Sequence, residues 1–266
     1  MEKKYVVLDK KAGETPLALL NRFRAENSWV GDKKLTYAGR LDPMASGKMI
    51  VLIGDECKNK EKYLAFDKEY EFEVLFGFSS DTGDILGLVE SGGGLPPDAV
   101  NEEDLRSAAE KLVGEITLPY PAFSSKTVRG KPLFAWALEG RLGEIEIPRR
   151  KSVVYRLEFV GLRTVPKDNL RAEIFEKIAK FNPTPGGKRD GFLGKDFRKR
   201  EVLDSWEAAL NETEEKEFKI AKFVCACSSG TYMRTLAVGL GKALGVKFLA
   251  FSIHRTKIAE CEIMLR

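Results

Sequence analysis

The sequence predicts an α+β fold in which a mixed sheet is flanked by helices. Residues 69–78 alternate between apolar and polar side chains, with Tyr70 and Phe72 on one face and Glu71 and Glu73 on the other, which is typical of a half-buried strand. Helices begin at recognisable capping residues, and they do not follow the strands in the strict βαβ order of a doubly wound parallel sheet. A mixed α+β domain is therefore favoured.

The first half of the chain predicts two capped helices with strands around them. Thr15 and Pro16 form an N-cap and a first helical position, so a helix is expected to start there. A glycine-flanked loop follows, and then an apolar run at residues 49–54. Asn101 is expected to cap a second helix, and Gly114 is expected to end it.

The second half predicts two more strands, a helix and a segment of different composition. Residues 152–162 and 218–227 are predicted strands, and the helix that follows the second one is expected to stop at Gly245. The stretch between these strands contains Pro-Gly-Gly and segregated charges. We interpret it as an insertion at about residues 163–217, with one or two helices of its own, in a single domain spanning residues 1–266.

Composition is typical of a globular protein and excludes several classes. The 266 residues are 43% hydrophobic and 32% charged. No apolar run approaches the roughly 18 to 20 residues that a membrane helix needs, and the charged N-terminus lacks the apolar core of a signal peptide. The sequence therefore predicts no membrane association and a cytoplasmic location.

Cysteine and histidine content limits the available chemistry. Four scattered cysteines do not form a disulfide framework, so buried reduced thiols are expected. The single histidine, His254, excludes zinc sites built on several histidines, and any Ser-His-Asp or Cys-His mechanism would need His254 itself. Any chemistry should therefore rest on carboxylates, Arg, Lys, Tyr or Cys.

Charge is unevenly distributed along the predicted insertion. Residues 187–200 hold six basic and two acidic side chains, whereas residues 201–217 hold seven acidic ones, in a chain whose net charge is +4. The basic stretch could follow a phosphate backbone or could be a solvated loop, and charge alone does not decide between them.

Asp42 and Arg234 are candidate functional residues. Asp42 precedes a proline on a glycine-flanked loop, which favours an extended conformation, although an ordinary Asx-Pro turn explains the pattern as well. Arg234 lies in the first turn of a predicted helix, where the macrodipole disfavours a cation by roughly 0.3–1 kcal/mol. It is expected either to have a carboxylate or phosphate partner or to be a surface arginine. Nothing in the alternation distinguishes Tyr70 from a core aromatic.

Four segments, taken in order, resemble those of the TruB-type tRNA pseudouridine synthases. They are YAGRLDPMASG, DKEYEFEVLFGFSSDTGDILG, PYPAFSSKTVRGKPLFAWALEGR and CSSGTYMRTLAVGLGKALG, and the opening VVLDKKAGETP is similar as well. The resemblance covers about residues 5–160 and 218–258. It implies the pseudouridine synthase fold, with a mostly antiparallel sheet, and an enzyme that isomerises a uridine in the T loop of tRNA, conventionally position 55.

The resemblance also implies roles for individual residues. Asp42 matches the family's nucleophile, Tyr70 matches the tyrosine that packs against the target base, and Arg234 matches the arginine that pairs with the nucleophile. The substrate-binding positions that it implies are Tyr37, Tyr232, Ile253, Lys10 and Arg40. The expected partner is the T-arm of tRNA, bound by a monomer. The reaction that the resemblance implies needs no metal and no cofactor, so none is expected.

These residue types suit the reaction, which breaks the N1–C1′ bond, turns the uracil and joins C5 to C1′. An ionised Asp42 can attack the sugar or remove its C2′ proton, and an adjacent arginine would keep the carboxylate charged. The base must leave the stack to be reached. Tyr70 offers it an aromatic face, and the hydroxyl could remove the C5 proton.

The chain departs from the family pattern in several places. Tyr37 stands where the family usually has a stacking histidine, and we expect it to stack in the same way. Arg40 creates an R-L-D triplet that resembles the ribosomal-RNA pseudouridine synthases. The chain ends at Arg266 without room for the usual C-terminal RNA-binding domain, and the hypothesis is that Lys188–Arg200 substitutes for it.

Alternative functions remain open at this stage. The protein could be a ribosomal-RNA pseudouridine synthase, or a non-catalytic RNA-binding or RNA-folding protein on the same scaffold. A carboxylate-based glycosidase would need a second acid about 5–10 Å from Asp42, for which Asp81 and Asp84 are available in the sequence.

Overall fold

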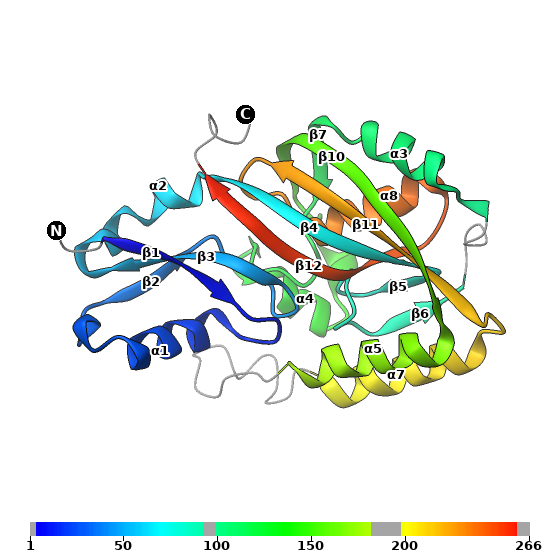
Figure 1. The fold of residues 1–266 in the computed structure, drawn as a ribbon, viewed down its shortest axis with the longest axis horizontal. Helices are drawn as coiled ribbons and strands as arrows, with labels where there is room; N and C mark the ends of the chain where they lie inside the picture. Colours follow the sequence, from blue (N-terminus) through cyan, green and yellow to red (C-terminus); the bar gives the residue numbers. More distant parts are fainter. Residues whose placement is uncertain (1–3, 93–98, 182–197, 260–266) are drawn as a thin grey trace.

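The computed structural model describes residues 4–92, 99–181 and 198–259, and its main element is an eight-stranded mixed sheet (Figure 1). The strand order is β1-β3-β12-β4-β11-β10-β7, with β2 paired to β3. Every pairing is antiparallel except that of β12 with β3. The strands of this sheet are β1 (Tyr5–Lys10), β2 (Leu35–Ala38), β3 (Ser46–Ile53), β4 (Asp67–Phe76), β7 (Gly114–Pro119), β10 (Arg149–Pro166), β11 (Glu217–Cys227) and β12 (Phe248–Ala259).

Two small hairpins and a set of helices complete the fold. The hairpins pair β5 (Phe78–Ser80) with β6 (Val89–Ser91), and β8 (Thr127–Val128) with β9 (Lys131–Pro132). The α-helices are α1 (Pro16–Glu26), α2 (Lys60–Leu64), α3 (Glu102–Glu110), α4 (Leu133–Leu138), α5 (Lys167–Ala179), α7 (Lys199–Glu212) and α8 (Met233–Leu244). Short 3-10 turns are η1 (Ser28–Val30), η2 (Gly54–Asn59) and η4 (Leu142–Glu144). None of the helices in the described part of the chain is long and apolar enough to span a membrane.

The helix boundaries follow the capping signals in the sequence, with one exception. Thr15 accepts a hydrogen bond from the Ala18 amide at 3.1 Å, and Asn101 forms a full capping box at the start of α3. Gly245 ends α8 in the left-handed conformation, at a φ of 70°. The expectation for Gly114 was wrong, because α3 ends at Glu110 and Gly114 is the first residue of β7.

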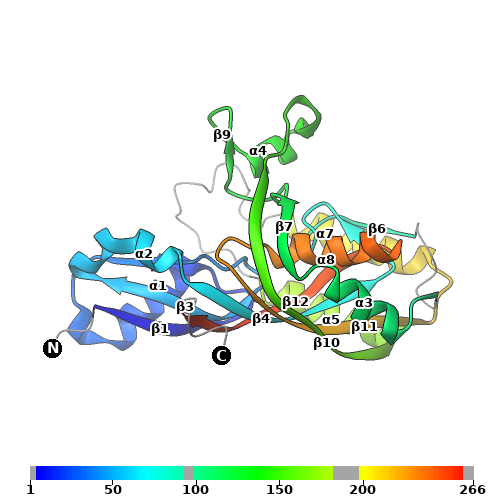
Figure 2. The ribbon, with the colours of Figure 1, turned by 90° about the horizontal axis from the view of Figure 1, so that it is seen from above.

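The predicted alternation of β4 divides the sheet into a core face and a solvent face. Phe72 and Val74 are buried in the main core, whereas Glu71 and Glu73 form ion pairs on the other face, Glu71 with Lys222 of the neighbouring strand at 2.6 Å. Figure 2 shows α3 and α8 together on one side of the sheet. The apolar faces of these helices therefore meet the apolar face of the strands.

The stretch predicted as an insertion packs into the same core. β10 runs beyond the predicted end at residue 162 to Pro166, so the helical part comprises α5 and α7, which lie side by side (Figure 1). The side chains of Ile174 and Trp206 are fully buried in the main core. The described part of this stretch thus holds two helices, and both pack into the main core. Residues 182–197, which hold most of the basic stretch, lie outside the described residues.

Candidate active site

Asp42 and Arg234 form an ion pair between the loop after β2 and the first turn of α8. The Arg234 Nε donates to the Asp42 Oδ2 at 2.7 Å. The Arg234 side chain is only 4% exposed, whereas the Asp42 side chain is 30% exposed. Of the two alternatives that its helix position left open, a charged partner or a surface arginine, the structure shows the first, with a carboxylate as the partner. The pair presents a fixed carboxylate to solvent and keeps its counter-charge inside the protein.

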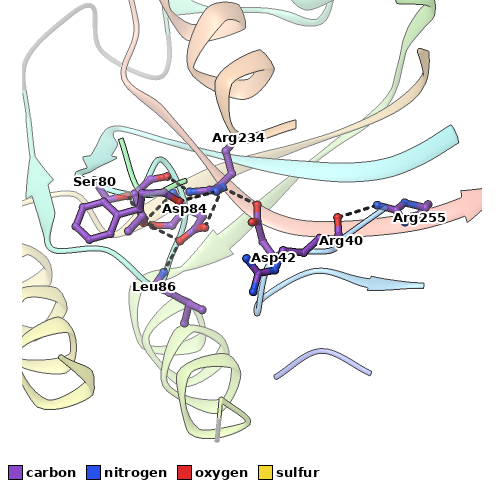
Figure 3. A network of polar contacts seen from close by, with 9 residues as sticks. Arg40, Asp42, Ser80, Asp84, Leu86, Arg234 and Arg255 are labelled. Carbon is purple, nitrogen blue, oxygen red and sulfur yellow. Dashed lines mark hydrogen bonds and ion pairs between the residues drawn. The ribbon is translucent and has the colours of Figure 1, made fainter. Parts of the chain in front are cut away.

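The guanidinium of Arg234 is held on every side (Figure 3). Its Nη1 donates to the Thr82 carbonyl at 2.7 Å, and its Nη2 donates to the Phe123 carbonyl at 3.3 Å. The Asp84 Oδ2 lies 3.6 Å from the Nε. Burial acts to lower the pKa of Arg234, but the charges of Asp42 and Asp84 outweigh it and raise that pKa. Arg234 is therefore a permanent, oriented cation.

Asp84 is a site residue that the sequence reasoning named only for a glycosidase. It is buried, and its Oδ1 accepts hydrogen bonds from the Thr82 hydroxyl at 2.7 Å and the Leu86 amide at 2.9 Å. Burial raises its pKa, Arg234 opposes that effect, and Asp42 adds to it. Since its oxygens face these groups rather than solvent, Asp84 is placed to hold Arg234, which disfavours a glycosidase proton donor.

Tyr70 lies on β4 with a buried arginine as its neighbour. Arg255 on β12 is opposite Tyr70 in the strand register, and its Nε lies 3.2 Å from the Tyr70 hydroxyl. The Arg255 guanidinium carbon also lies 5.3 Å from the centroid of the Tyr70 ring. Burial raises the pKa of Tyr70 to about 12, although the charge of Arg255 opposes the rise. The phenol is therefore protonated at neutral pH.

Arg255 connects the strand that carries Tyr70 to the loop that carries Asp42. It is 2% exposed, and its Nη1 donates to the carbonyls of Gly39 at 2.8 Å and Lys48 at 3.2 Å. Its Nη2 donates to the Arg40 carbonyl at 3.2 Å (Figure 3). Sequence reasoning missed this residue. The available signal was an arginine at an inward position of a strand whose neighbours are apolar.

Lys10 supports the base of the Asp42 loop. Its side chain is buried, and the Nζ donates to the carbonyls of Glu14 at 2.7 Å, Lys11 at 3.0 Å and Pro43 at 3.3 Å. Burial lowers the pKa of Lys10 to about 8, and the nearby charges of Glu14 and Asp42 oppose that shift. Because Pro43 directly follows Asp42, this ammonium fixes the backbone beside the carboxylate.

Tyr232 and Ile253 lie at the edges of the site. Tyr232 is the residue before α8, its ring meets that of Tyr120 edge-on at 5.6 Å, and burial followed by the charge of Asp42 raises its pKa. Ile253 is buried on β12 opposite Phe72. It also borders a cavity of about 140 Å³. Other side chains that line this cavity are Met44, Ile85, Leu86, Lys177, Phe251 and His254.

The two remaining predicted residues contribute differently. Arg40 has an exposed side chain, and its carbonyl accepts the hydrogen bond from Arg255. Tyr37 is half-buried on β2 and packs against the small core cluster beneath α1, with the Lys60 Nζ 5.2 Å from its ring centroid. The structure thus brings Asp42, Arg234 and Tyr232 close together, and the described contacts of Tyr37 lie elsewhere.

The buried ammonium of Lys10 predicts a pH-dependent stability. Between about pH 8 and pH 10.5 the unfolded chain holds a proton on Lys10 that the folded protein has released, so stability rises with pH in that window. Relative to Lys10→Met, the wild-type protein should gain up to about 3 kcal/mol of unfolding free energy across it. Urea unfolding at several pH values measures this. Lys11→Met, which removes an exposed ammonium, is the control, and its difference in unfolding free energy from the wild type should not change with pH. The prediction is contradicted if the difference for Lys10→Met does not change with pH either.

Comparison with known proteins relates this geometry to a family. The model of the TruB family pseudouridylate synthases (N-terminal domain) matches residues 27–175, which is more than half of the chain. The tRNA pseudouridine synthase B of Chlamydia pneumoniae is 30% identical over 241 residues, which are 90% of this chain and 76% of that protein.

Other relatives are longer than this chain. The tRNA pseudouridine synthase B of Caldanaerobacter subterraneus subsp. tengcongensis is 40% identical over 131 residues, 49% of this chain and 44% of its own. The tRNA pseudouridine synthase 4 of Saccharomyces cerevisiae is 30% identical over 237 residues, 81% of this chain and 58% of its own. The chain therefore spans about half the length of these two relatives.

A solved structure shares the fold. A chain of "Crystal Structure of a Cbf5-Nop10-Gar1 Complex" superposes with a TM-score of 0.53 and 17% sequence identity, covering 96% of this chain and 48% of that one. This likeness confirms the predicted α+β fold with a mixed, mostly antiparallel sheet. Together with the match over residues 27–175 and the relative from Chlamydia pneumoniae, it leads to one assignment: the chain belongs to the TruB family of pseudouridylate synthases.

Proposed function

We propose that the protein isomerises a uridine in the T loop of tRNA, at position 55, to pseudouridine. The observation that carries the proposal is the partly exposed Asp42 carboxylate, held 2.7 Å from the buried Arg234 in a chain of the TruB family. A fixed, ionised carboxylate at the surface of a site is what a nucleophile needs. The names of the relatives, which are tRNA pseudouridine synthases, favour tRNA as the substrate.

Asp42 acts on the sugar of a uridine that has left the stack. One oxygen accepts the hydrogen bond from Arg234, which fixes the direction of the carboxylate. The carboxylate attacks C1′ as the N1–C1′ bond breaks, or it removes the C2′ proton so that the same bond breaks by elimination. The detached uracil carries the electron pair of that bond and turns. C5 then bonds to C1′ as the Asp42 oxygen leaves C1′ or, on the elimination route, as Asp42 returns its proton to C2′.

Tyr70 completes the reaction in this proposal. After C5 has bonded to C1′, the C5 proton must leave and N1 must gain a proton. The phenol of Tyr70, whose pKa burial raises to about 12, starts this step protonated and gives its proton to N1, directly or through water. The Arg255 Nε at 3.2 Å stabilises the resulting phenolate, which then takes the C5 proton and becomes a phenol again.

Tyr70→Phe tests this role, since it keeps the aromatic face and removes the hydroxyl. The rate of product formation on bound RNA should fall by about 10²- to 10⁴-fold, the usual range for a lost general base, while RNA affinity stays close to that of the wild type. Single-turnover assays with separate binding measurements distinguish the two. Undiminished product release by Tyr70→Phe would rule the proton-transfer role out.

A ribosomal-RNA substrate is the second candidate. The R-L-D triplet formed by Arg40 favours it, and the exposed Arg40 side chain beside the Asp42 loop is free to contact RNA. A binding-only function on the same scaffold is disfavoured, because Asp42, Tyr70 and Arg234 are all present.

Pseudouridine mapping with the wild-type protein tests the substrate. The RNAs are an unmodified tRNA transcript, the same transcript with the T-loop uridine replaced by cytidine, an isolated T-arm stem-loop and a ribosomal RNA transcript. Modification confined to the T-loop uridine is expected, with the cytidine transcript inert. Product on ribosomal RNA alone would replace the tRNA assignment, and no product on any of them would leave RNA binding as the function.

A further inference from the structure

Arg198 is the residue directly before α7, at the end of the basic stretch, and its side chain is mostly buried. Its backbone has a φ of 57°, in the left-handed region that residues other than glycine seldom adopt. The Nη1 donates to the Asp81 Oδ2 at 2.7 Å, and the guanidinium carbon lies 4.6 Å from the centroid of the Phe123 ring. The side chain is 19% exposed. A strained backbone that carries a well-packed side chain indicates that this side chain is needed where it lies.

The two partners of Arg198 belong to the two segments that hold Arg234. Asp81 directly precedes Thr82, whose carbonyl receives the Arg234 Nη1, and the Phe123 carbonyl itself receives the Arg234 Nη2. Arg198 and Arg234 therefore contact the same two segments. Arg198 contacts the side chains of Asp81 and Phe123, and Arg234 contacts the backbone carbonyls of Thr82 and Phe123.

α7 itself supports the same segment that Arg198 contacts. The other oxygen of Asp81 accepts the Leu88 amide at 2.9 Å, which closes the loop that carries Asp84. The Trp206 Nε1 donates to the Ile85 carbonyl at 3.0 Å, and the Ser205 hydroxyl accepts the Val89 amide at 3.2 Å. α7 thus forms hydrogen bonds with the segment that follows Asp81 at two further points, the Ile85 carbonyl and the Val89 amide.

We propose that Arg198 is a positioning residue for the reaction, which acts through Asp81 and Phe123 to fix the guanidinium of Arg234 and, through it, Asp42. This inference rests on the proposed function for its kinetic readout only. It assigns a role in the reaction to the start of α7, which no local sequence pattern predicts.

The rival role for Arg198 is an RNA phosphate contact, as its place in the basic stretch suggests. The geometry opposes that role, because the guanidinium is already engaged by a carboxylate and an aromatic ring. The next residue behaves similarly, since the Lys199 Nζ donates to the carbonyls of Ala179 at 3.2 Å and Phe181 at 3.3 Å. Arg198 and Lys199 thus connect the start of α7 to neighbouring segments of the protein. A positioning role predicts a lower rate with unchanged Kd when Arg198 is replaced, whereas a phosphate contact predicts a higher Kd.

The kinetic test compares Arg198→Gln with Arg106→Gln. Arg106 is a matched control on α3, because it also pairs with a carboxylate, at 3.0 Å from Glu102, and also lies over a phenylalanine ring, at 4.8 Å. Arg198→Gln should lower the single-turnover rate on bound tRNA by about 10-fold or more, the size expected for a slight misplacement of a reacting group, with Kd and its salt dependence unchanged. Arg106→Gln should leave all three quantities as in the wild type.

Two further variants separate positioning from general destabilisation, with every assay run well below the melting temperature of the variant. Asp81→Asn should reproduce the loss, and the double variant Arg198→Gln/Asp81→Asn should be no worse than either single one. Arg198→Lys should recover part of the rate. A wild-type rate for Arg198→Gln, or a loss confined to Kd with a flatter salt dependence, would overturn the inference.

An NMR measurement tests the positioning without any substrate. The Nε–H resonance of Arg234, assigned by its disappearance in Arg234→Lys, should be sharp in the wild type and broadened in Arg198→Gln. An unchanged resonance would refute the proposal even if the protein proved inactive on tRNA. Absence of pseudouridine with both the wild type and Arg106→Gln would instead contradict the proposed function.

Discussion

Replacing Asp42 by asparagine is expected to abolish pseudouridine formation while leaving RNA binding nearly intact. The amide has the shape of the carboxylate but no negative charge, so it neither attacks C1′ nor removes the C2′ proton. The loss should be on the order of 10⁴-fold or more, as when other enzymes lose a nucleophile. The fold should survive, because Arg234 keeps Asp84 at 3.6 Å and its two carbonyl acceptors.

The measurement is pseudouridine mapping on an unmodified tRNA transcript, with binding followed separately. Asp9→Asn is the control, since it removes an exposed carboxylate that pairs with Lys48 at 2.8 Å on the edge of the sheet. Product at the wild-type rate from Asp42→Asn would contradict the assignment of the nucleophile. Loss of RNA binding in the same variant would instead make Asp42 a binding residue.

Arg234→Lys is the second change with a large expected effect. The guanidinium contacts Asp42, Asp84 and two carbonyls at once, and the compact ammonium of lysine reproduces at most part of this planar arrangement. The rate on bound RNA should fall by about 10²- to 10³-fold, the usual cost of losing a preorganised electrostatic contact. Arg234→Gln should also destabilise the fold by about 3 kcal/mol, because the buried Asp84 then lacks its counter-charge.

Single-turnover rates and melting curves check both variants. Arg156→Lys is the matched control, because Arg156 also pairs with a carboxylate, Glu69 at 2.8 Å, but is 45% exposed on the solvent face of the sheet. In Arg234→Gln the pKa of Asp84 should rise further, since the charge of Arg234 lowers it in the wild type. If Arg234→Lys kept the wild-type rate and stability, the planar arrangement of the guanidinium would have no role.

The parts of the site that the sequence predicted are those with local causes. Thr15 and Pro16 determine where α1 begins, and the macrodipole at the start of α8 made a carboxylate or phosphate partner one of two expectations for Arg234. The alternation along β4 placed Tyr70 on the inward face, although it did not separate this residue from its aromatic neighbours. Each of these features depends on a few consecutive residues.

The parts that the sequence did not predict depend on pairing between distant segments. Asp84 reaches Arg234 only because its loop packs over the start of α8, and Arg255 reaches Tyr70 only because β12 pairs with β4 in one particular register. The existence of helices between β10 and β11 was predictable from composition. The burial of Trp206 against the Ile85 carbonyl was not, because it depends on how the helices pack on the sheet.

The position of β12 determines when the proposed site can first form during synthesis of the chain. β12 lies between β3 and β4, and its parallel pairing with β3 comprises only His254–Ser46 and Arg255–Gly47. Asp42 and Tyr70 leave the ribosome early, but the strand that joins their two regions is the last one described. Until it inserts, the edges of β3 and β4 are unpaired and exposed to other chains. The proposed site is thus incomplete until nearly all of the described chain has emerged, and the closure of such long-range pairings makes folding slow.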